Sequence, residues 1–132
     1  DMVLVHDGAR PLATRAMMET AITATMTKKA TTMAVPVKDT ITVVDRQTGT
    51  ISHTPARGSL YSIQTPQTFS REILLRAHHA AFADGFNGTD DASLVERLGI
   101  AVTVLMGSYT NIKITTPEDL LIAEAFMQGG NP

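Results

Sequence analysis

The sequence predicts an α/β domain, in which helices pack in layers against a sheet. Short apolar runs typical of strands alternate along the chain with segments whose apolar residues recur at helical spacing. The helical segments begin with capping residues, and turn-forming residues separate them from the strands. The length of 132 residues corresponds to one domain or less and is sufficient for a buried core.

The first part of the chain is predicted to place a helix between two strands. Residues 2–6 form an apolar strand, and a loop at 7–11 follows it. Thr14 is a suitable N-cap for a helix that runs to about Lys28. A second apolar strand is predicted at residues 32–37.

Residues 41–61 are predicted to form a protruding β-hairpin. Two β-rich runs, 41–44 and 50–54, flank a turn at 45–49. The hairpin is polar and has few core residues, and an isolated hairpin is only marginally stable in water. We therefore expect it to lie against another surface, such as a second subunit.

The rest of the chain continues the alternation. Ser70 and Thr89 are predicted to cap helices that run to about Ala83 and to Leu98, and Pro117 opens the last helix. Extended segments are predicted at residues 61–66, 101–106 and 111–115. Residues 128–132 are predicted to be an irregular tail.

Composition and charge argue against several classes of protein. A net charge of −2 does not suit a nucleic-acid surface. The lack of cysteine excludes disulfides and thiol chemistry and suits a cytoplasmic protein. No apolar run approaches the roughly 20 residues of a membrane span. The four histidines lack the spacing of a zinc site, so we assign neither metal binding nor other chemistry to His6, His53, His78 and His79.

Lys113 is the most informative candidate for a ligand-binding residue. It ends a strand-like run just before the helix opened by Pro117, where an ammonium group can reach an anionic ligand. An edge-strand lysine facing water is the alternative. Asp7 and Arg10 follow the first strand, at the position where ligands bind in open α/β sheets, and a loop salt bridge or an Asx-turn is the alternative.

Other polar segments have a structural interpretation as the first reading and a functional one as the alternative. Thr40 belongs to a turn that can simply initiate a strand, Arg57 to a loop where it can be solvated, and Thr65 to a segment ordered by Pro66. The run at 89–93 suits a helix start, and a metal-binding or hydroxyl-binding role is the alternative there. Charged side chains beside turns in several segments together suggest phosphate chemistry.

Five segments resemble, in order and spacing, the C-terminal half of 2-C-methyl-D-erythritol 4-phosphate cytidylyltransferase, a family of the non-mevalonate isoprenoid pathway. They are VLVHDGARP at 3–11, PVKDTI at 36–41, QTPQTF at 64–69, TDDAS at 89–93, and NIKIT with PEDL at 111–120. The resemblance covers nearly all of the chain. It implies that residues 1–132 are the C-terminal part of one cytidylyltransferase domain, with a partial Rossmann-like nucleotidyltransferase sheet. It also implies a homodimer that uses the 41–61 arm.

The resemblance implies a reaction in which the phosphate oxygen of a polyol phosphate attacks the α-phosphorus of CTP and pyrophosphate leaves. Mg²⁺ would be bound mainly through the CTP phosphates, with no metal ligand assigned in this chain. Lys113 and Asp7 would be catalytic, Lys113 at the two reacting phosphates and Asp7 at the acceptor hydroxyls. Substrate-binding roles would belong to Arg10 and Thr65, and to Thr40 and Arg57 acting from the partner subunit.

One departure from the family limits this interpretation. The glycine-rich CTP-binding loop and the first strands belong to the family's N-terminal half, which this sequence does not contain. The CTP-binding residues are therefore unknown, and we expect the chain alone to be inactive without that half. The alternatives are a cytidylyltransferase for ribitol phosphate, a non-catalytic dimerising fragment, and a sugar-phosphate uridylyltransferase of the same fold.

Overall fold

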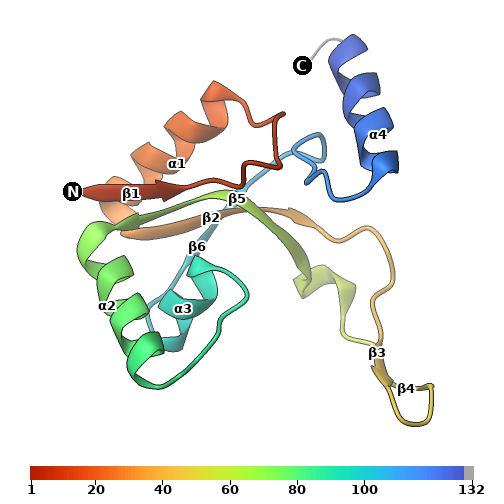
Figure 1. The fold of residues 1–132 in the computed structure, drawn as a ribbon, viewed down its shortest axis with the longest axis horizontal. Helices are drawn as coiled ribbons and strands as arrows, with labels where there is room; N and C mark the ends of the chain where they lie inside the picture. Colours follow the sequence, from red (N-terminus) through yellow and green to blue (C-terminus); the bar gives the residue numbers. More distant parts are fainter. Residues whose placement is uncertain (130–132) are drawn as a thin grey trace.

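A mixed four-stranded sheet organises the protein (Figure 1). The computed structural model describes residues 1–129. The strands are β1 (Met2–Val5), β5 (Tyr61–Ser70), β2 (Ala30–Pro36) and β6 (Thr103–Met106), in that order across the sheet. β5 runs antiparallel to β1 and β2, whereas β2 and β6 are parallel. The predicted α/β class is confirmed.

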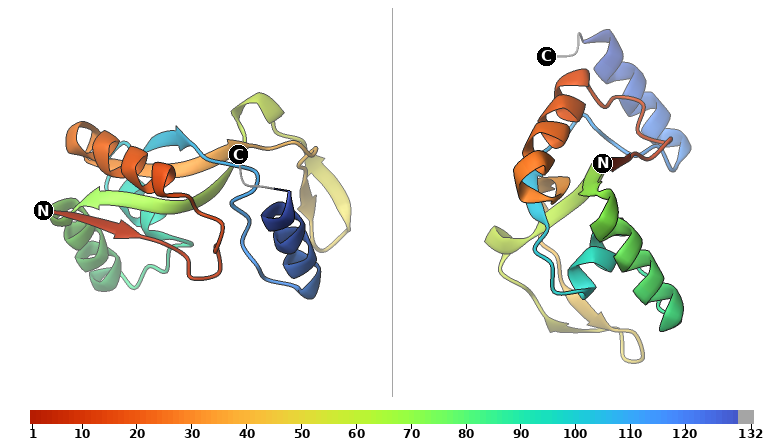
Figure 2. Two further views of the ribbon diagram at one scale, coloured as in Figure 1. Left: turned by 90° about the horizontal axis from the view of Figure 1, so that it is seen from above. Right: turned by 90° about the vertical axis from the view of Figure 1, so that its left-hand side faces the viewer.

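Helices cover both faces of this sheet, as Figures 1 and 2 show. On one face, Met17 and Ala21 of α1 (Arg15–Lys28) pack with Met33. On the other face, α2 (Arg71–Ala83) and α3 (Asp91–Arg97) pack around Phe69. β2 is buried along almost its whole length because it lies between these two layers, so its residues do not alternate between buried and exposed.

Helix starts follow the predicted caps in two cases and differ by one residue in a third. The Thr14 and Ser70 side chains accept hydrogen bonds from the first turns of α1 and α2, as predicted. Thr89 was the wrong choice for α3, because Asp90 accepts from the Ser93 N–H at 2.8 Å and the Ser93 hydroxyl reaches back to Asp90. Adjacent Thr and Asp are both good caps, and this reciprocal pairing decides between them.

The predicted strand at 111–115 is wrong, because this segment is irregular. The Ile114 N–H donates to the Ala9 carbonyl at 2.8 Å, which ties the segment to the loop after β1. Among residues 1–129, no strand pairs with it. Its β-branched residues favour an extended backbone, but a strand also needs a ladder partner. The segment instead connects β6 to α4 (Pro117–Gln128), which begins at the predicted proline.

β5 is longer than predicted and contains an irregularity. Thr32 of β2 pairs with Gln67, and Ala34 pairs with Ile63. Met33 alone therefore faces the three β5 residues 64–66, and Pro66 among them has no N–H for the ladder. Such a bulge redirects side chains locally, and Gln64 and Thr65 hydrogen-bond to loops beyond the sheet.

The predicted hairpin is confirmed. β3 (Val43–Asp45) pairs with β4 (Thr50–His53) in an arm that extends away from the sheet, followed by the short 3₁₀ helix Arg57–Ser59 (Figures 1 and 2). Every residue of both hairpin strands is exposed. The arm therefore has no core of its own.

The last helix contributes little to the core. Ala123 is buried, but Leu121 and Met127 are largely exposed. The predicted irregular tail at 128–132 is wrong at Gln128, which ends α4, while residues 130–132 lie outside the described part of the chain.

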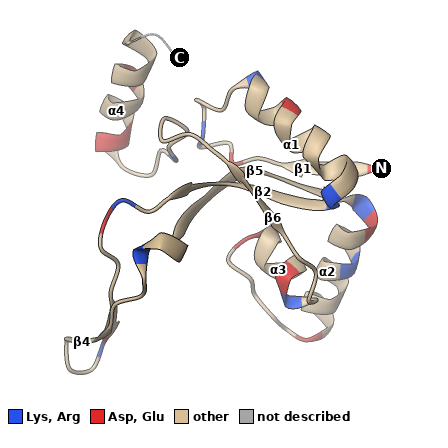
Figure 3. Cartoon of the chain, turned by 180° about the vertical axis from the view of Figure 1, so that it is seen from behind, with Lys and Arg blue, Asp and Glu red and all other residues tan. Residues whose placement is uncertain are grey.

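Positive and negative side chains are interspersed over the fold (Figure 3). Within residues 1–129, no helix combines the length and apolar character needed to cross a membrane.

Candidate active site

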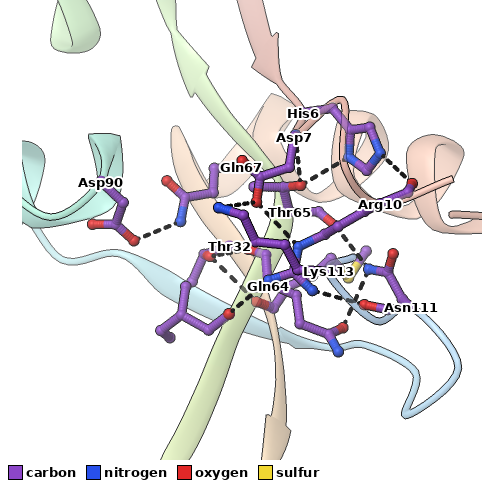
Figure 4. Close-up of polar contacts among 12 residues, drawn as sticks. His6, Asp7, Arg10, Thr32, Gln64, Thr65, Gln67, Asp90, Asn111 and Lys113 are labelled. Carbon is purple, nitrogen blue, oxygen red and sulfur yellow. Dashed lines mark hydrogen bonds and ion pairs between the residues drawn. The ribbon is translucent and has the colours of Figure 1, made fainter. Parts of the chain in front are cut away.

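Three charged side chains from distant parts of the sequence meet beside the carboxyl end of β1. Lys113 Nζ lies 3.4 Å from Asp7 Oδ2, and Arg10 Nε lies 3.2 Å from the same oxygen (Figure 4). The Arg10 side chain is 11% exposed and Lys113 is 47% exposed. The loop salt bridge that the sequence left open is thus present, and Lys113 joins it.

The Arg10 guanidinium connects three segments of the chain. Besides Asp7, its guanidinium donates to the Asn111 carbonyl at 2.7 Å and lies 3.5 Å from the Ile63 carbonyl. A planar guanidinium can serve several acceptors in fixed directions, which lysine cannot. Because Arg10 already balances the charge of Asp7, the half-exposed ammonium of Lys113 is available to an anion.

Thr65 links β5 to the loop after β1. Its hydroxyl oxygen accepts from the Asp7 N–H at 3.0 Å and lies 2.9 Å from His6 Nδ1. His6 Nε2 in turn donates to the Arg10 carbonyl at 3.0 Å. The prediction assigned no chemistry to His6, and its two hydrogen-bond partners were not apparent from the sequence.

A buried amide pair fixes the segment that carries Lys113. Gln64 Nε2 donates to the Ser108 carbonyl at 2.8 Å, and its Oε1 accepts from the Ser108 N–H at 3.3 Å. Asn111, which is fully buried, donates to the Thr65 carbonyl at 2.9 Å and to Gln64 Oε1 at 3.3 Å. These bonds anchor the beginning of the 111–115 segment, which has no strand ladder with any other described residue.

A second amide connects β5 to the start of α3. Gln67 Nε2 donates to Asp90 Oδ2 at 2.8 Å, and Gln67 Oε1 accepts from the Ala92 N–H at 3.0 Å. Both ends of this buried side chain are therefore used. The spacing of Gln64 and Gln67 on either side of Thr65–Pro66 was a usable signal, because polar residues in a buried strand need partners.

The charged groups line one concave pocket of about 410 Å³. Its wall includes Asp7, Arg10, Thr65 and Lys113 from the predicted site, and residues 89–91 from the start of α3. The volume is within the range of small-molecule sites. Four of the six predicted site residues therefore lie around one cavity.

Thr40 and Arg57 lie elsewhere in this chain. Neither lines the pocket, and the Arg57 guanidinium donates to the Lys38 carbonyl at 3.1 Å at the base of the arm. We predicted that both residues reach the site of a partner subunit. That placement stays a prediction, because a single chain does not test it.

The ion cluster lowers the pKa of Asp7. Partial burial acts to raise the pKa, but the Arg10 hydrogen bond and the Lys113 charge and hydrogen bond outweigh it. The native carboxylate therefore titrates below its unfolded value, and its stabilising contribution is present above that value. The contribution is lost as the pH falls through the lowered pKa.

We expect Asp7→Asn to destabilise the protein at neutral pH and to lose this effect in acid. The difference in free energy of unfolding between native and variant protein should shrink as the pH falls below about 4, the ordinary aspartate range. Denaturant titrations at neutral and acid pH measure this difference. An equal difference at both pH values would contradict a charged, ion-paired Asp7.

Comparison with known proteins identifies the family. The family model described as 2-C-methyl-D-erythritol 4-phosphate cytidylyltransferase matches residues 1–129. The chain belongs to this family. Two curated cytidylyltransferases of that name, from Bacillus mycoides and from Caldanaerobacter subterraneus subsp. tengcongensis, are 55% and 51% identical to it. These matches cover 96% and 97% of this chain, but only 55% and 56% of the relatives.

Solved structures of cytidylyltransferases agree in fold. The 4-diphosphocytidyl-2C-methyl-D-erythritol synthase of Anaerococcus prevotii aligns with a TM-score of 0.88 at 38% identity, over 96% of this chain and 56% of that one. The enzyme of Thermus thermophilus aligns with a TM-score of 0.85 at 35% identity, over 96% and 62%. The Rossmann-like cytidylyltransferase fold is confirmed, and the chain spans about half the length of the curated relatives.

Proposed function

We propose that this chain supplies the acceptor-phosphate side of a CTP-dependent 2-C-methyl-D-erythritol 4-phosphate cytidylyltransferase. Residues 1–132 form the C-terminal part of its single catalytic domain in this proposal. The observation that supports it most strongly is the half-exposed Lys113 ammonium, 3.4 Å from a carboxylate that Arg10 already balances. Membership of the cytidylyltransferase family supports CTP as the nucleotide and cytidylyl transfer as the reaction class.

In the proposed reaction, an oxygen of the acceptor phosphate attacks the α-phosphorus of CTP. The new P–O bond forms as the bond to the bridging oxygen breaks, and pyrophosphate leaves. Lys113 draws the two phosphates together and balances negative charge that develops at the α-phosphate. Asp7, beside Lys113, accepts hydrogen bonds from acceptor hydroxyls.

The remaining predicted residues have supporting roles. Arg10 holds Asp7 and the Asn111 segment, and Thr65 holds the Asp7 backbone. Thr40 and Arg57 contact the acceptor phosphate from the partner subunit of a homodimer built with the 41–61 arm. These two residues lie at the base of the exposed hairpin, which is consistent with a contact outside their own chain.

Magnesium enters this proposal through the nucleotide. Among residues 1–129, no group of three His, Cys, Asp or Glu side chains is arranged to hold a metal ion. Asp7 already accepts from two cationic side chains. The chain therefore offers cations for phosphate oxygens, and Mg²⁺ bound to CTP would neutralise the leaving pyrophosphate.

The acceptor is tested by comparing two polyol phosphates. The protein that contains this chain is produced at its full natural length, and CTP-dependent pyrophosphate release is measured with methylerythritol phosphate and with ribitol phosphate. We expect faster turnover with methylerythritol phosphate and only background release without an acceptor. Faster turnover with ribitol phosphate would overturn the proposed acceptor, and no release with either would overturn the reaction.

A further inference from the structure

His6 contacts both of the groups that hold Asp7. The Asp7 backbone is held by Thr65 Oγ1, and its carboxylate is held by Arg10. One ring nitrogen of His6 lies 2.9 Å from Thr65 Oγ1, and the other lies 3.0 Å from the Arg10 carbonyl (Figure 4). The imidazole therefore bridges the two anchors of the carboxylate that faces Lys113.

The chemistry of the partners sets the protons in this network. A carbonyl oxygen only accepts, so His6 Nε2 carries a proton and donates it to Arg10. In the neutral ring, Nδ1 then presents a lone pair, and the Thr65 hydroxyl donates to it. Thr65 Oγ1 remains free to accept from the Asp7 N–H. Each donor in this network has an acceptor. The donation runs in one direction, from the Asp7 N–H to Thr65, from Thr65 to His6, and from His6 to the Arg10 carbonyl.

We propose that His6 is a positioning residue for the acceptor-phosphate pocket. Its ring, in the Nε2–H form, orients the Thr65 hydroxyl and closes the 6–10 loop, and together these hold Asp7 beside Lys113. This inference rests on the proposed function of the pocket. Small displacements of aligned groups are costly for transfer reactions, so a residue that never touches the substrate can still affect the rate.

Loss of the network should change the kinetic parameters for the acceptor rather than those for CTP. Asp7 contacts only the acceptor in the proposed reaction, whereas Lys113 contacts both phosphates, and the two hydrogen bonds of His6 act on the Asp7 loop. A ring that merely filled space would influence stability and would leave the balance between the two substrates unchanged. The ratio of the two KM values therefore separates positioning from simple packing.

Three substitutions at His6 dissect the two bonds in the full-length protein. His6→Phe keeps the ring and removes both bonds, and kcat/KM for the acceptor should fall about tenfold, consistent with the loss of hydrogen bonds that orient the site. The KM for CTP should stay within about twofold, because CTP does not depend on Asp7 in this proposal. His79→Phe, on the exposed side of α2, is the matched control and should leave both values unchanged.

The two amide substitutions supply a rescue that packing does not predict. Asn places a polar atom near the Nδ1 position, and Gln places one near Nε2, so His6→Asn and His6→Gln should each recover part of the activity lost in His6→Phe. If His6→Phe retains full activity, or exceeds both amide variants, the ring serves packing and the proposal is wrong.

The double variant His6→Phe with Thr65→Val should lose less transition-state stabilisation than the sum of the two single losses, because both substitutions act on one network.

A spectroscopic measurement tests the network without any turnover. Long-range ¹H–¹⁵N correlation spectra of the native full-length protein, recorded well above the ordinary histidine pKa, should show His6 as the Nε2–H tautomer. The Nδ1–H tautomer would overturn the proposed bond directions. If the native protein transfers no cytidylyl group but His6 has the expected tautomer, the proposed function fails and the hydrogen-bond arrangement is retained.

Discussion

Replacing Lys113 with alanine in the full-length protein is expected to lower turnover by about a hundredfold or more. The reason is electrostatic, because removal of one preorganised group that stabilises developing charge typically costs about 3–4 kcal/mol of transition-state stabilisation. Lys113 is the half-exposed cation of the pocket, whereas Arg10 is occupied by Asp7 and the Asn111 carbonyl. Steady-state pyrophosphate release at saturating CTP and acceptor measures the effect.

The control for this experiment is a lysine outside the pocket. Lys28, exposed at the end of α1, should tolerate alanine with no change in turnover. The Lys113→Ala protein should also unfold at nearly the native denaturant concentration, because a partly exposed ion pair contributes little to stability. A variant with an unchanged rate would remove Lys113 from the reacting site.

Replacing Phe69 with alanine is expected to destabilise the protein by about 3–5 kcal/mol. Phe69 is fully buried between the sheet and the α2–α3 layer, and its loss would leave a cavity beside Leu74 and Val95. It also lies two residues after Gln67, so a shift of β5 would be transmitted to the pocket. The free energy of unfolding, measured by denaturant titration of the full-length protein, gives the size of the effect.

Phe82 is a matched control in the same chain. Its side chain is 91% exposed on α2, so the same substitution removes little buried contact. We expect Phe82→Ala to change the free energy of unfolding by less than about 0.5 kcal/mol. Equal losses at the two positions would show that burial in the sheet–helix core does not determine the cost.

Features set by neighbouring residues were the most predictable from the sequence. The caps at Thr14 and Ser70, the proline start of α4 and the hairpin all depend on local chemistry, and the structure contains each of them. The strand expected at 111–115 failed because a ladder partner is a tertiary property. Local propensity favours an extended backbone there, but it cannot supply a second strand.

The candidate site was predictable where residues carried charge and less so where they carried amides. Asp7, Arg10 and Lys113 stood out as charges beside turns, and the structure brings them together. His6 was missed because one partner is a backbone carbonyl and the other lies 59 residues away. Gln67 and Asp90 form a pair that exists only after β5 and the start of α3 have met.

The hairpin is joined directly to the strand that lines the pocket. The arm leaves the sheet where β2 ends and returns where β5 begins, and Pro36 and Tyr61 are paired at its root. The Val37 N–H donates to the Leu60 carbonyl at 3.0 Å, which clamps the two strands together there. Ile63 and Gln64, in the pocket wall, follow within a few residues of Tyr61 along the same strand. The strand on which the arm ends therefore continues directly into the wall of the cavity, so a force applied to the arm by a neighbouring molecule would reach the pocket through the backbone of β5.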